Sequence, residues 1–564
     1  MLYCIWTFVT SFLNLGYSGL PIISSEVHIS ELARLQALKP TLQTICSILG
    51  TVGASIGVLH HGKVLYTDNI GYRDVATRTV ADSQILYGIG SLTKSMVAVA
   101  VGQLVDRRKL SWTTPIKEVL PDFNHYDPSI TNLTTVVDLL SHQTGLSGDI
   151  SLTFQGDGDA LLPADQLIPT INGMEMVDTF RNTWSYNSWG YSLAGLMVEK
   201  LSGLAIHEYL DQFVYGPLEM HGTTTTQPSF TAGDNVAEPY ASFANSTPVH
   251  VAKRMEFRDT LFEPAAGAYV NVDDMLKWSA ALLDTYQSGG KPDSLLKELD
   301  RIFSAEIPVR GPSYRERSYA LGWIRTQLPG VLGAMGENVD ILGGIDDLPE
   351  LGHHAPSKLC FYHLGSTVGY YSSIVLFPET QSAVVVLANS IPLSDSPDNI
   401  AQAITQALFD FPHPIDFVSL TTMVTRKLVE SYDEMAATLA QRRQSGTNRP
   451  NLNEYAGRYW NGLGNFVLEI TAYEEAGTDT LQLAFQGLKS QIYSLRHLAN
   501  DTFEWSLTLN EEALRGRYHI SDPSYFIVEF LSEGRTITKL GWIGYTFVKE
   551  EHHDSFSQIV LEKT

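Results

Sequence analysis

The feature that most constrains the fold is a change of hydrophobic pattern near residue 451. Between residues 31 and 415, strand-like runs and helical stretches are mixed, whereas residues 452–564 consist of short alternating runs separated by turn residues. Alternation with a period of two is typical of half-buried strands, and regular turns between them predict a small antiparallel barrel or sandwich. A chain of 564 residues is also too long for one core. We therefore predict an α/β domain, a helix and linker over residues 416–451, and a β-barrel domain.

Strand-like runs stand at both ends of the α/β domain. Residues 53–70 predict a hairpin that turns at His61-Gly62, and residues 372–378 and 382–389 are apolar and β-branched. A sheet that pairs the two ends of the domain, with helices between them in sequence, is the arrangement we expect. Helical spacing predicts these helices over residues 91–108, 136–142, 188–202 and 273–285.

The charge balance excludes one class of partner. The chain has 38 Lys and Arg against 62 Asp and Glu, a formal net charge of −24, and no long basic run. Contacts to phosphate need clustered Lys and Arg, so we expect no nucleic acid partner. Only Cys4, Cys46 and Cys360 occur, no C-x-x-C pair is present, and no histidine pair has metal-ligand spacing. Neither a metal site nor a disulfide framework is predicted.

Residues 1–30 include an apolar stretch of signal-peptide length. No Lys or Arg precedes the stretch, and no small-residue cleavage site follows it, although secretory signals carry both. We expect either a signal peptide or a disordered N-terminus, which leaves secretion and a cytoplasmic location both open. Elsewhere no stretch is long and apolar enough to span a bilayer. Nothing in the sequence indicates the oligomeric state.

A serine one helical turn before a lysine is a candidate nucleophile beside its base. The tetrad S-x-x-K occurs three times, at Ser91-Lys94, Ser288-Lys291 and Ser294-Lys297. The second copy lies in a Gly-Gly-Pro loop, which cannot hold the two side chains one turn apart. The third is expected to begin an ordinary amphipathic helix. Ser91 instead stands where a strand-like run turns through glycine into a long apolar helix, and a helix N-terminus favours developing negative charge.

Two further segments extend this pattern. "WSYNSWGYSLAG" (184–195) places Tyr186 just ahead of a helix, and "LCFYHLGSTVGYYSSIVLF" (359–377) places His363-Leu364-Gly365 in front of a strand. In the order Ser-Lys, Tyr, His-x-Gly, these segments resemble the serine β-lactamase and penicillin-binding-protein superfamily. The resemblance covers about residues 40–412. It is greatest to class C-type members and to fungal β-lactamase-related hydrolases and acyltransferases.

The resemblance implies a fold and a set of catalytic roles. The fold is a β-lactamase/transpeptidase-like α/β domain (31–415), with an antiparallel sheet, flanking helices and an all-α subdomain. Residues 452–564 resemble the lipocalin-like tail of some members. Ser91 would be the acylated nucleophile, Lys94 would accept its proton, and Tyr186 would be the second member of the proton relay. The N–H groups of Ser91 and Ser366 would form the oxyanion hole. No metal or organic cofactor would be needed.

Three residues are expected to contact the substrate: Ser188, His363 and Gly365. Two of them depart from the β-lactamase pattern, which has Tyr-x-Asn where this chain has Tyr-Asn-Ser, and Lys in place of His363. A largely uncharged imidazole is a weaker anchor for the carboxylate of a β-lactam than an ammonium group. Both departures argue against efficient antibiotic hydrolysis and fit esterases, transesterases and peptidases of this fold.

The sequence thus indicates a serine hydrolase or acyltransferase that works through an acyl-enzyme. Its partners would be a small-molecule ester, amide or thioester as acyl donor, and water, an alcohol or an amine as acceptor, as in fungal secondary metabolism. A D-amino-acid peptidase or a β-lactamase is one alternative, and a catalytically silent binding or scaffold protein is another. The long insertion at 328–358 is expected to be a loop near the site, and it leaves the substrate open.

Overall fold

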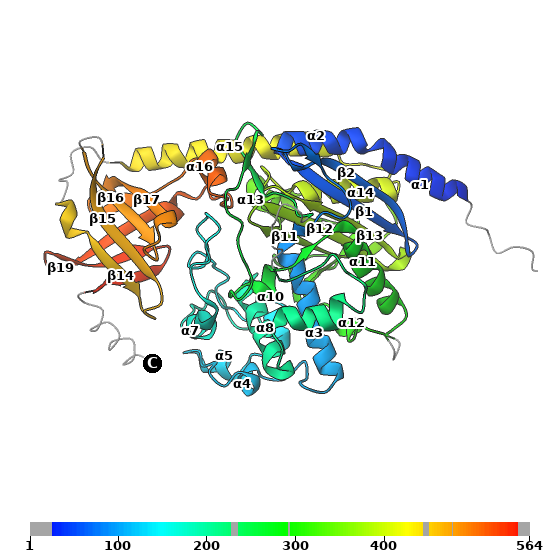
Figure 1. Cartoon of the computed structure of the whole chain (residues 1–564), viewed down its shortest axis with the longest axis horizontal. Coiled ribbons are helices and arrows are strands. Elements are labelled where there is room, and N and C mark those ends of the chain that lie inside the picture. The colour runs from blue at the N-terminus through cyan, green and yellow to red at the C-terminus, as the bar shows by residue number, and fades with distance from the viewer. Residues whose placement is uncertain (1–24, 227–234, 291–293, 444–450, 476–477, 551–564) are drawn as a thin grey trace, which may run out of the picture.

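The computed structural model describes residues 25–226, 235–290, 294–443, 451–475 and 478–550. Figure 1 shows a larger α/β unit beside a β-barrel, with one long helix passing from the first to the second. This helix is α15 (Phe417–Arg442). Both parts of the predicted architecture are present: an antiparallel sheet with flanking helices, and a closed antiparallel barrel that follows it in the chain. The exact domain limits remain a prediction, and most of the expected linker lies outside the described residues.

The central sheet joins the two ends of the α/β unit. Strand β1 (Gly53–His60) pairs with β2 (Lys63–Asp74) through the expected hairpin, and on its other side with β13 (Ser382–Ala388). The nine strands follow the order β3-β2-β1-β13-β12-β11-β10-β9-β8. The remaining bounds are β3 (Thr79–Val80), β8 (Ile307–Pro308), β9 (Arg317–Tyr319), β10 (Ile324–Leu328), β11 (Lys358–Thr367) and β12 (Tyr370–Phe377).

Helices cover both faces of this sheet. Helix α11 (Val272–Gln287) packs on β1 and β13, whereas α14 (Ser396–Leu408) packs on β12 and β13 and against α1 (Ser25–Ala37) and α2 (Lys39–Leu49). Every residue of β1, β12 and β13 is buried, as expected for strands covered on both sides.

The remaining helices form the expected helical region (Figure 1). Its centre is α3 (Thr93–Asp106), which packs against α8 (Ser188–Ser202) and α10 (Glu263–Ala266). Twelve of the fourteen residues of α3 are buried, so this helix is apolar on all sides because it is surrounded by protein. The others are α4 (Ile116–Val119), α5 (Pro128–Leu133), α6 (Val136–Leu140), α7 (Leu167–Asn172), α9 (Ile206–Leu210) and α12 (Leu299–Ile302).

The C-terminal barrel closes through eight strands, β14 to β21. Helix α16 (Leu509–Leu514) interrupts the strand sequence between β18 and β19. The strand bounds are β14 (Gly457–Asn461), β15 (Val467–Glu475), β16 (Thr478–Phe485), β17 (Ile492–Ala499), β18 (Thr502–Glu504), β19 (Ile527–Glu533), β20 (Thr536–Trp542) and β21 (Tyr545–Lys549).

The barrel is joined to the α/β unit by buried hydrogen bonds. Gln491 Nε2 donates to the carbonyl of Gly156 over 2.8 Å, and Arg517 Nη1 donates to Gln155 Oε1 over the same distance. Arg517 is 2% exposed although it is charged. Buried polar contacts of this kind fix one orientation, because loss of either partner would leave the other unsatisfied.

Three local expectations differ from the structure. Residues 25–30, expected to precede the folded domain, belong to α1. Ser294 does not begin a helix, since α12 starts only at Leu299. The insertion at 328–358 is not purely a loop, because it contains α13 (Glu337–Leu342). Within the described ranges, no helix combines the length and the apolar character that crossing a membrane requires.

Candidate active site

Ser91 lies in one turn of 3-10 helix, Gly90–Leu92, which leads directly into α3. Gly90 has φ +50°, and a Cβ atom there would come within 2.4 Å of the carbonyl oxygen of Ser366. Glycine is therefore required for the turn to approach strand β11. The close approach brings Ser91 and Ser366 to the same place, although 275 positions separate them in the sequence (366 − 91).

Lys94 lies one turn after Ser91 and is completely buried. Its Nζ donates hydrogen bonds to Ser91 Oγ and to the carbonyl of Ala265, each over 3.0 Å. The part of the chain that the structure describes offers it no carboxylate partner. Burial disfavours the ammonium form and lowers the pKa of Lys94 from 10.5 to about 7. A substantial fraction of this amine is therefore neutral near pH 7 and able to accept a proton.

Tyr186 completes the predicted group. Lys94 Nζ lies 5.1 Å from the centroid of the Tyr186 ring. Burial raises the pKa of Tyr186, while the hydroxyls of Ser91 and Ser188 lower it in part. The buried Tyr186 hydroxyl has no hydrogen-bond partner of normal geometry among the described residues. It is thus a neutral phenol that can bind a reacting group. The next residue, Asn187, caps α8 by accepting from Trp189 N.

Ser91, Tyr186 and Ser366 line two cavities at once. One has a volume of about 220 Å³ and is named here the polar cavity. The other, of about 140 Å³, is named the apolar cavity. Of the residues predicted to contact substrate, Gly365 lines the polar cavity and Ser188 lines the apolar one.

The apolar cavity is built by both parts of the chain. Tyr518, from the barrel segment after α16, is the residue that the barrel supplies. Its hydroxyl interacts with Ser366, and burial raises its pKa. The other large apolar side chains around this cavity come from the α/β unit: Ile150, Phe154, Met255, Phe257 and Phe262.

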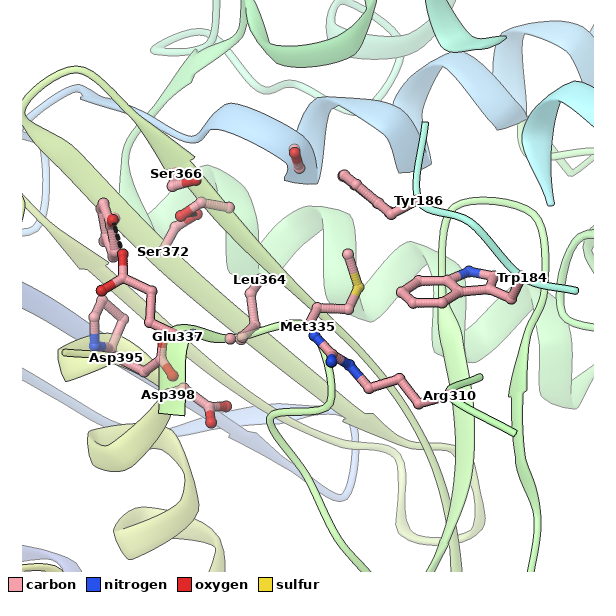
Figure 2. A pocket seen from close by; sticks show the side chains of 15 residues that line it. Trp184, Tyr186, Arg310, Met335, Glu337, Leu364, Ser366, Ser372, Asp395 and Asp398 are labelled. Carbon is pink, nitrogen blue, oxygen red and sulfur yellow. Dashed lines mark hydrogen bonds between the residues drawn. The ribbon is translucent and has the colours of Figure 1, made fainter. Parts of the chain in front are cut away.

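The polar cavity has acidic groups at one end, and an aromatic and a basic group at the other. Figure 2 shows Glu337, Asp395 and Asp398 close together, with Arg310 and Trp184 across the cavity from them. Glu337 comes from α13, inside the insertion that was expected to lie near the site. The part of the insertion that contains the start of α13 therefore lies at the site, as expected.

His363 does not occupy the predicted position. It stands inside β11 rather than before a strand, is 0% exposed, and is absent from the lining of both cavities. Its Nε2 bonds Tyr319 Oη over 2.9 Å. Burial, aided by the charge of Lys94, lowers the pKa of His363 to about 3. Side chains alternate along a strand, so His363 points away while Leu364 and Ser366 face the cavity. A direct contact with substrate is therefore not supported.

Sequence reasoning did not single out His142 and Tyr319, which support the site from behind. The His142 ring lies 4.4 Å from that of Tyr186 and 4.5 Å from that of Tyr319 (centroid distances). Burial, together with the charge of Lys94, lowers the pKa of His142 well below 6.5. Both neighbouring imidazoles are thus neutral at pH 7. His142 stands in the segment "LLSHQTGLSG" (139–148), which contains none of the motifs on which the resemblance was based.

The serines of the other two S-x-x-K copies have other hydrogen-bond partners. Ser288 ends α11, and its Oγ donates to the carbonyl of Thr285. Its lysine partner lies outside the described residues. Ser294 Oγ pairs with Thr285 Oγ1 over 2.9 Å. Neither serine lines the two cavities that contain Ser91.

Reactive cysteine and metal chemistry find little support in the described ranges. Burial raises the pKa of Cys46 to about 12 and that of Cys360 still further, so both thiols stay protonated. No group of His, Cys, Asp and Glu in these ranges has an arrangement suited to a metal ion. That the protein needs no cofactor stays a prediction.

Two named proteins are similar to this chain in sequence. An unguisins hydrolase of Aspergillus violaceofuscus is 25% identical over 358 residues, which cover 60% of this chain and 58% of that protein. The protein named flp of Staphylococcus aureus is 23% identical over 343 residues, with coverage of 60% and 59%. The chain therefore spans less than two-thirds of the length of these relatives.

A structural comparison supports the fold alone. The octameric penicillin-binding protein homologue from Pyrococcus abyssi superposes with a TM-score of 0.54 at 20% identity, covering 92% of this chain and 100% of that one. The family model described as Beta-lactamase matches residues 42–408, a range that includes Ser91, Lys94, Tyr186 and Ser366. Since this match covers well over half of the sequence, the chain belongs to the beta-lactamase family.

Proposed function

We propose that this protein is a serine hydrolase or acyltransferase that forms an acyl-enzyme on Ser91. The observation that carries the proposal is the pair formed by Ser91 and Lys94. A completely buried amine with a pKa of about 7 donates a 3.0 Å hydrogen bond to a serine hydroxyl that lines two cavities. A nucleophile within reach of a base poised near the working pH is the arrangement that acyl transfer requires.

In the first step, neutral Lys94 accepts the proton of Ser91 Oγ as that oxygen bonds to the acyl carbon of the substrate. The N–H groups of Ser91 and Ser366 are proposed to stabilise the resulting oxyanion, since the first N–H groups of a helix lack intrahelical partners. The bond to the leaving group then breaks, and the leaving atom receives the proton from Lys94. The acyl group remains as an ester of Ser91.

In the second step, water, an alcohol or an amine attacks the ester. Tyr186 is proposed to pass the proton of this acceptor toward Lys94. Because burial raises its pKa, Tyr186 acts as a relay that takes one proton while giving another, rather than as a free phenolate. Ser91 Oγ recovers its proton when the acyl group leaves, so the enzyme returns to its initial state.

The substrate is proposed to be an ester, amide or thioester of a small molecule, as would suit a role in secondary metabolism. The relatives named unguisins hydrolases favour hydrolysis of a natural product. A D-amino-acid peptidase is an alternative with the same chemistry. β-Lactamase activity has less support, because His363 is neutral and buried behind the site. The preserved contact between Ser91 and Lys94 argues against a silent scaffold protein.

A fluorophosphonate probe followed by mass spectrometry tests this proposal. We expect one adduct on Ser91, with no adduct in Ser91→Ala. Ser288→Ala is the matched control, because it removes the serine of another S-x-x-K copy and should label like the wild type. An adduct on any other residue, or no adduct with a panel of acyl and phosphonyl donors, would refute Ser91 as the nucleophile.

A further inference from the structure

The acidic end of the polar cavity consists of three carboxylates from two helix starts. Glu337 is the first residue of α13, whereas Asp395 immediately precedes α14 and Asp398 lies in its first turn. Asp395 caps the start of α13: its carboxylate accepts hydrogen bonds from the N–H groups of Glu337 and Asn338 at 2.9 and 2.8 Å. These bonds account for Asp395 as a structural residue.

Glu337 also has its partners. Its Oε1 accepts from Tyr371 Oη, and its Oε2 lies 2.9 Å from Nδ1 of His519, a residue of the barrel. Burial opposes the charge on both members of this pair, but their mutual attraction lowers the pKa of Glu337 and raises that of His519. Glu337 is thus a carboxylate neutralised by a cation.

Asp398 differs from both neighbours. It is 3% exposed and lines the polar cavity. One oxygen, Oδ2, accepts from Gln402 Nε2 over 2.7 Å, while Oδ1 has no hydrogen-bond partner among the described residues. In the same part of the chain, neither Asp398 nor Asp395 forms an ion pair with Lys, Arg or His. Arg310, a cation of the cavity lining, is already engaged with the carbonyl of Ala334 and with Asp340.

A buried carboxylate without a counter-charge is costly, and it is normally paired or protonated. Burial raises the pKa of Asp398 to about 7, so this carboxyl group is partly protonated at neutral pH. The start of α14 favours the ionised form, because the helix dipole is positive there. What Asp398 lacks, among the described residues, is a donor that carries a positive charge.

We propose that the polar cavity binds an ammonium group of the substrate, held by the carboxylate of Asp398. This inference deepens the proposed function, on which it rests, by naming a substrate class: acyl donors or acceptors that carry an amine. Burial and the nearby Glu337 raise the pKa of Asp395 to about 8, so Asp398, once ionised, is the group that would repel a carboxylate or phosphate. A neutral amide could donate a hydrogen bond to Oδ1 but would leave the charge uncompensated.

The ammonium group can belong to the acyl donor or to the acceptor, and matched pairs of compounds distinguish the two. For the donor, kcat/KM is measured with the p-nitrophenyl esters of 6-aminohexanoate and heptanoate, which differ only by an ammonium in place of a methyl group. For the acceptor, transfer from p-nitrophenyl acetate to ethanolamine is compared with transfer to 1-propanol. We expect a preference for the ammonium compound of about 10- to 100-fold in one of the two pairs, the range of a charge-assisted hydrogen bond.

Asp398→Asn tests the assigned residue, since asparagine keeps an acceptor for Gln402 but removes the charge. The preference should fall about tenfold or more in this variant. Asp346→Asn is the matched control: it removes an exposed carboxylate from the same insertion, outside the cavity lining, and should leave both preferences unchanged. A preference below twofold in both pairs, or an equal preference in wild type and Asp398→Asn, overturns the proposal.

A binding measurement separates this proposal from the proposed catalytic function. Titration calorimetry with butylammonium and with 1-butanol requires no acylation of Ser91. We expect butylammonium to bind wild type at least tenfold more tightly than it binds Asp398→Asn, with melting curves confirming that both are folded. Failure of fluorophosphonate labelling with this binding difference intact would refute only the catalytic role. Equal binding by both proteins would refute the ammonium site, whatever Ser91 does.

Discussion

The pH at which Lys94 loses its proton should control acylation. Burial lowers its pKa from 10.5 to about 7. At pH 7.5 about three-quarters of the Lys94 amines would then be neutral, against ~0.1% for an ordinary lysine, a gain of about 700-fold in active base. Because the neutral amine accepts the serine proton, the rate should rise as the pH increases through 7 and then level off.

The assay is the second-order rate constant for fluorophosphonate labelling of Ser91, measured from about pH 5 to about pH 9.5. Lys94→Ala should label ~10²–10⁴-fold more slowly, the loss expected for a general base, and the inflection near pH 7 should disappear. A rate that shows no inflection near pH 7 and still rises at the upper end of this range would mean that Lys94 is not desolvated. An inflection that survives in Lys94→Ala would refute Lys94 as the titrating base.

Other groups near Ser91 have to be excluded as the source of such an inflection. His363 and His142 titrate far below pH 7, because burial lowers the pKa of each. Asp398 and Asp395 are the competitors, since burial raises their pKa values to about 7 and about 8. Asp398→Asn should therefore keep the midpoint. Loss of the midpoint in this variant, with Lys94 intact, would assign the titration to the carboxylate.

Four further substitutions test the remaining assignments. Ser91→Ala should abolish turnover while the melting temperature stays close to that of the wild type, because only a hydroxyl at a cavity is lost; a residual rate above one-tenth would contradict this. Tyr186→Phe should lower kcat by ~10²–10⁴, and an unchanged kcat in steady-state assays would remove Tyr186 from the relay. Tyr518→Ala should lower kcat/KM for long acyl chains more than for acetate, because the side chain lines the apolar cavity; equal losses for both chain lengths would show a purely structural role. His363→Lys should lower the melting temperature, because it places a charge at a position that is 0% exposed and close to Lys94. An unchanged melting curve, or faster turnover of carboxylate-bearing β-lactams, would instead support a direct contact of residue 363 with substrate.

The sequence predicted helices, strands and the spacing of residues along them better than it predicted the environment of individual side chains. The spacing of Ser91 and Lys94 was enough to bring their side chains into contact, because helical geometry fixes a separation of three residues. The sequence did not show that His363 lies outside the lining of both cavities, because a single sequence does not reveal which face of a strand borders a cavity. A contact of His363 with substrate stays a prediction. Asp398 carried no visible signal, since an acidic residue in the first turn of a helix is ordinary.

The contribution of the barrel was beyond sequence reasoning for a different reason. Tyr518 and His519 reach the site through contacts between two separately patterned parts of the chain. Hydrophobic periodicity predicts which residues of each part face its own core. It contains no information on how the two parts dock. The alternating pattern therefore predicted the barrel itself and could not predict which of its residues meet Ser366 or Glu337.

The pairing of β1 with β13 has a consequence for the synthesis of this protein. Ala54 of β1 pairs with Ala388, 334 positions later (388 − 54). At ~5–20 residues per second, a ribosome needs about 20–70 seconds to deliver the missing partner. During that interval the β1–β2 hairpin can form, but one edge of a strand that is entirely buried in the finished protein stays open to other nascent chains. Slower initiation, lower temperature or more chaperone should therefore increase the soluble yield more than any change to the surface of the finished protein.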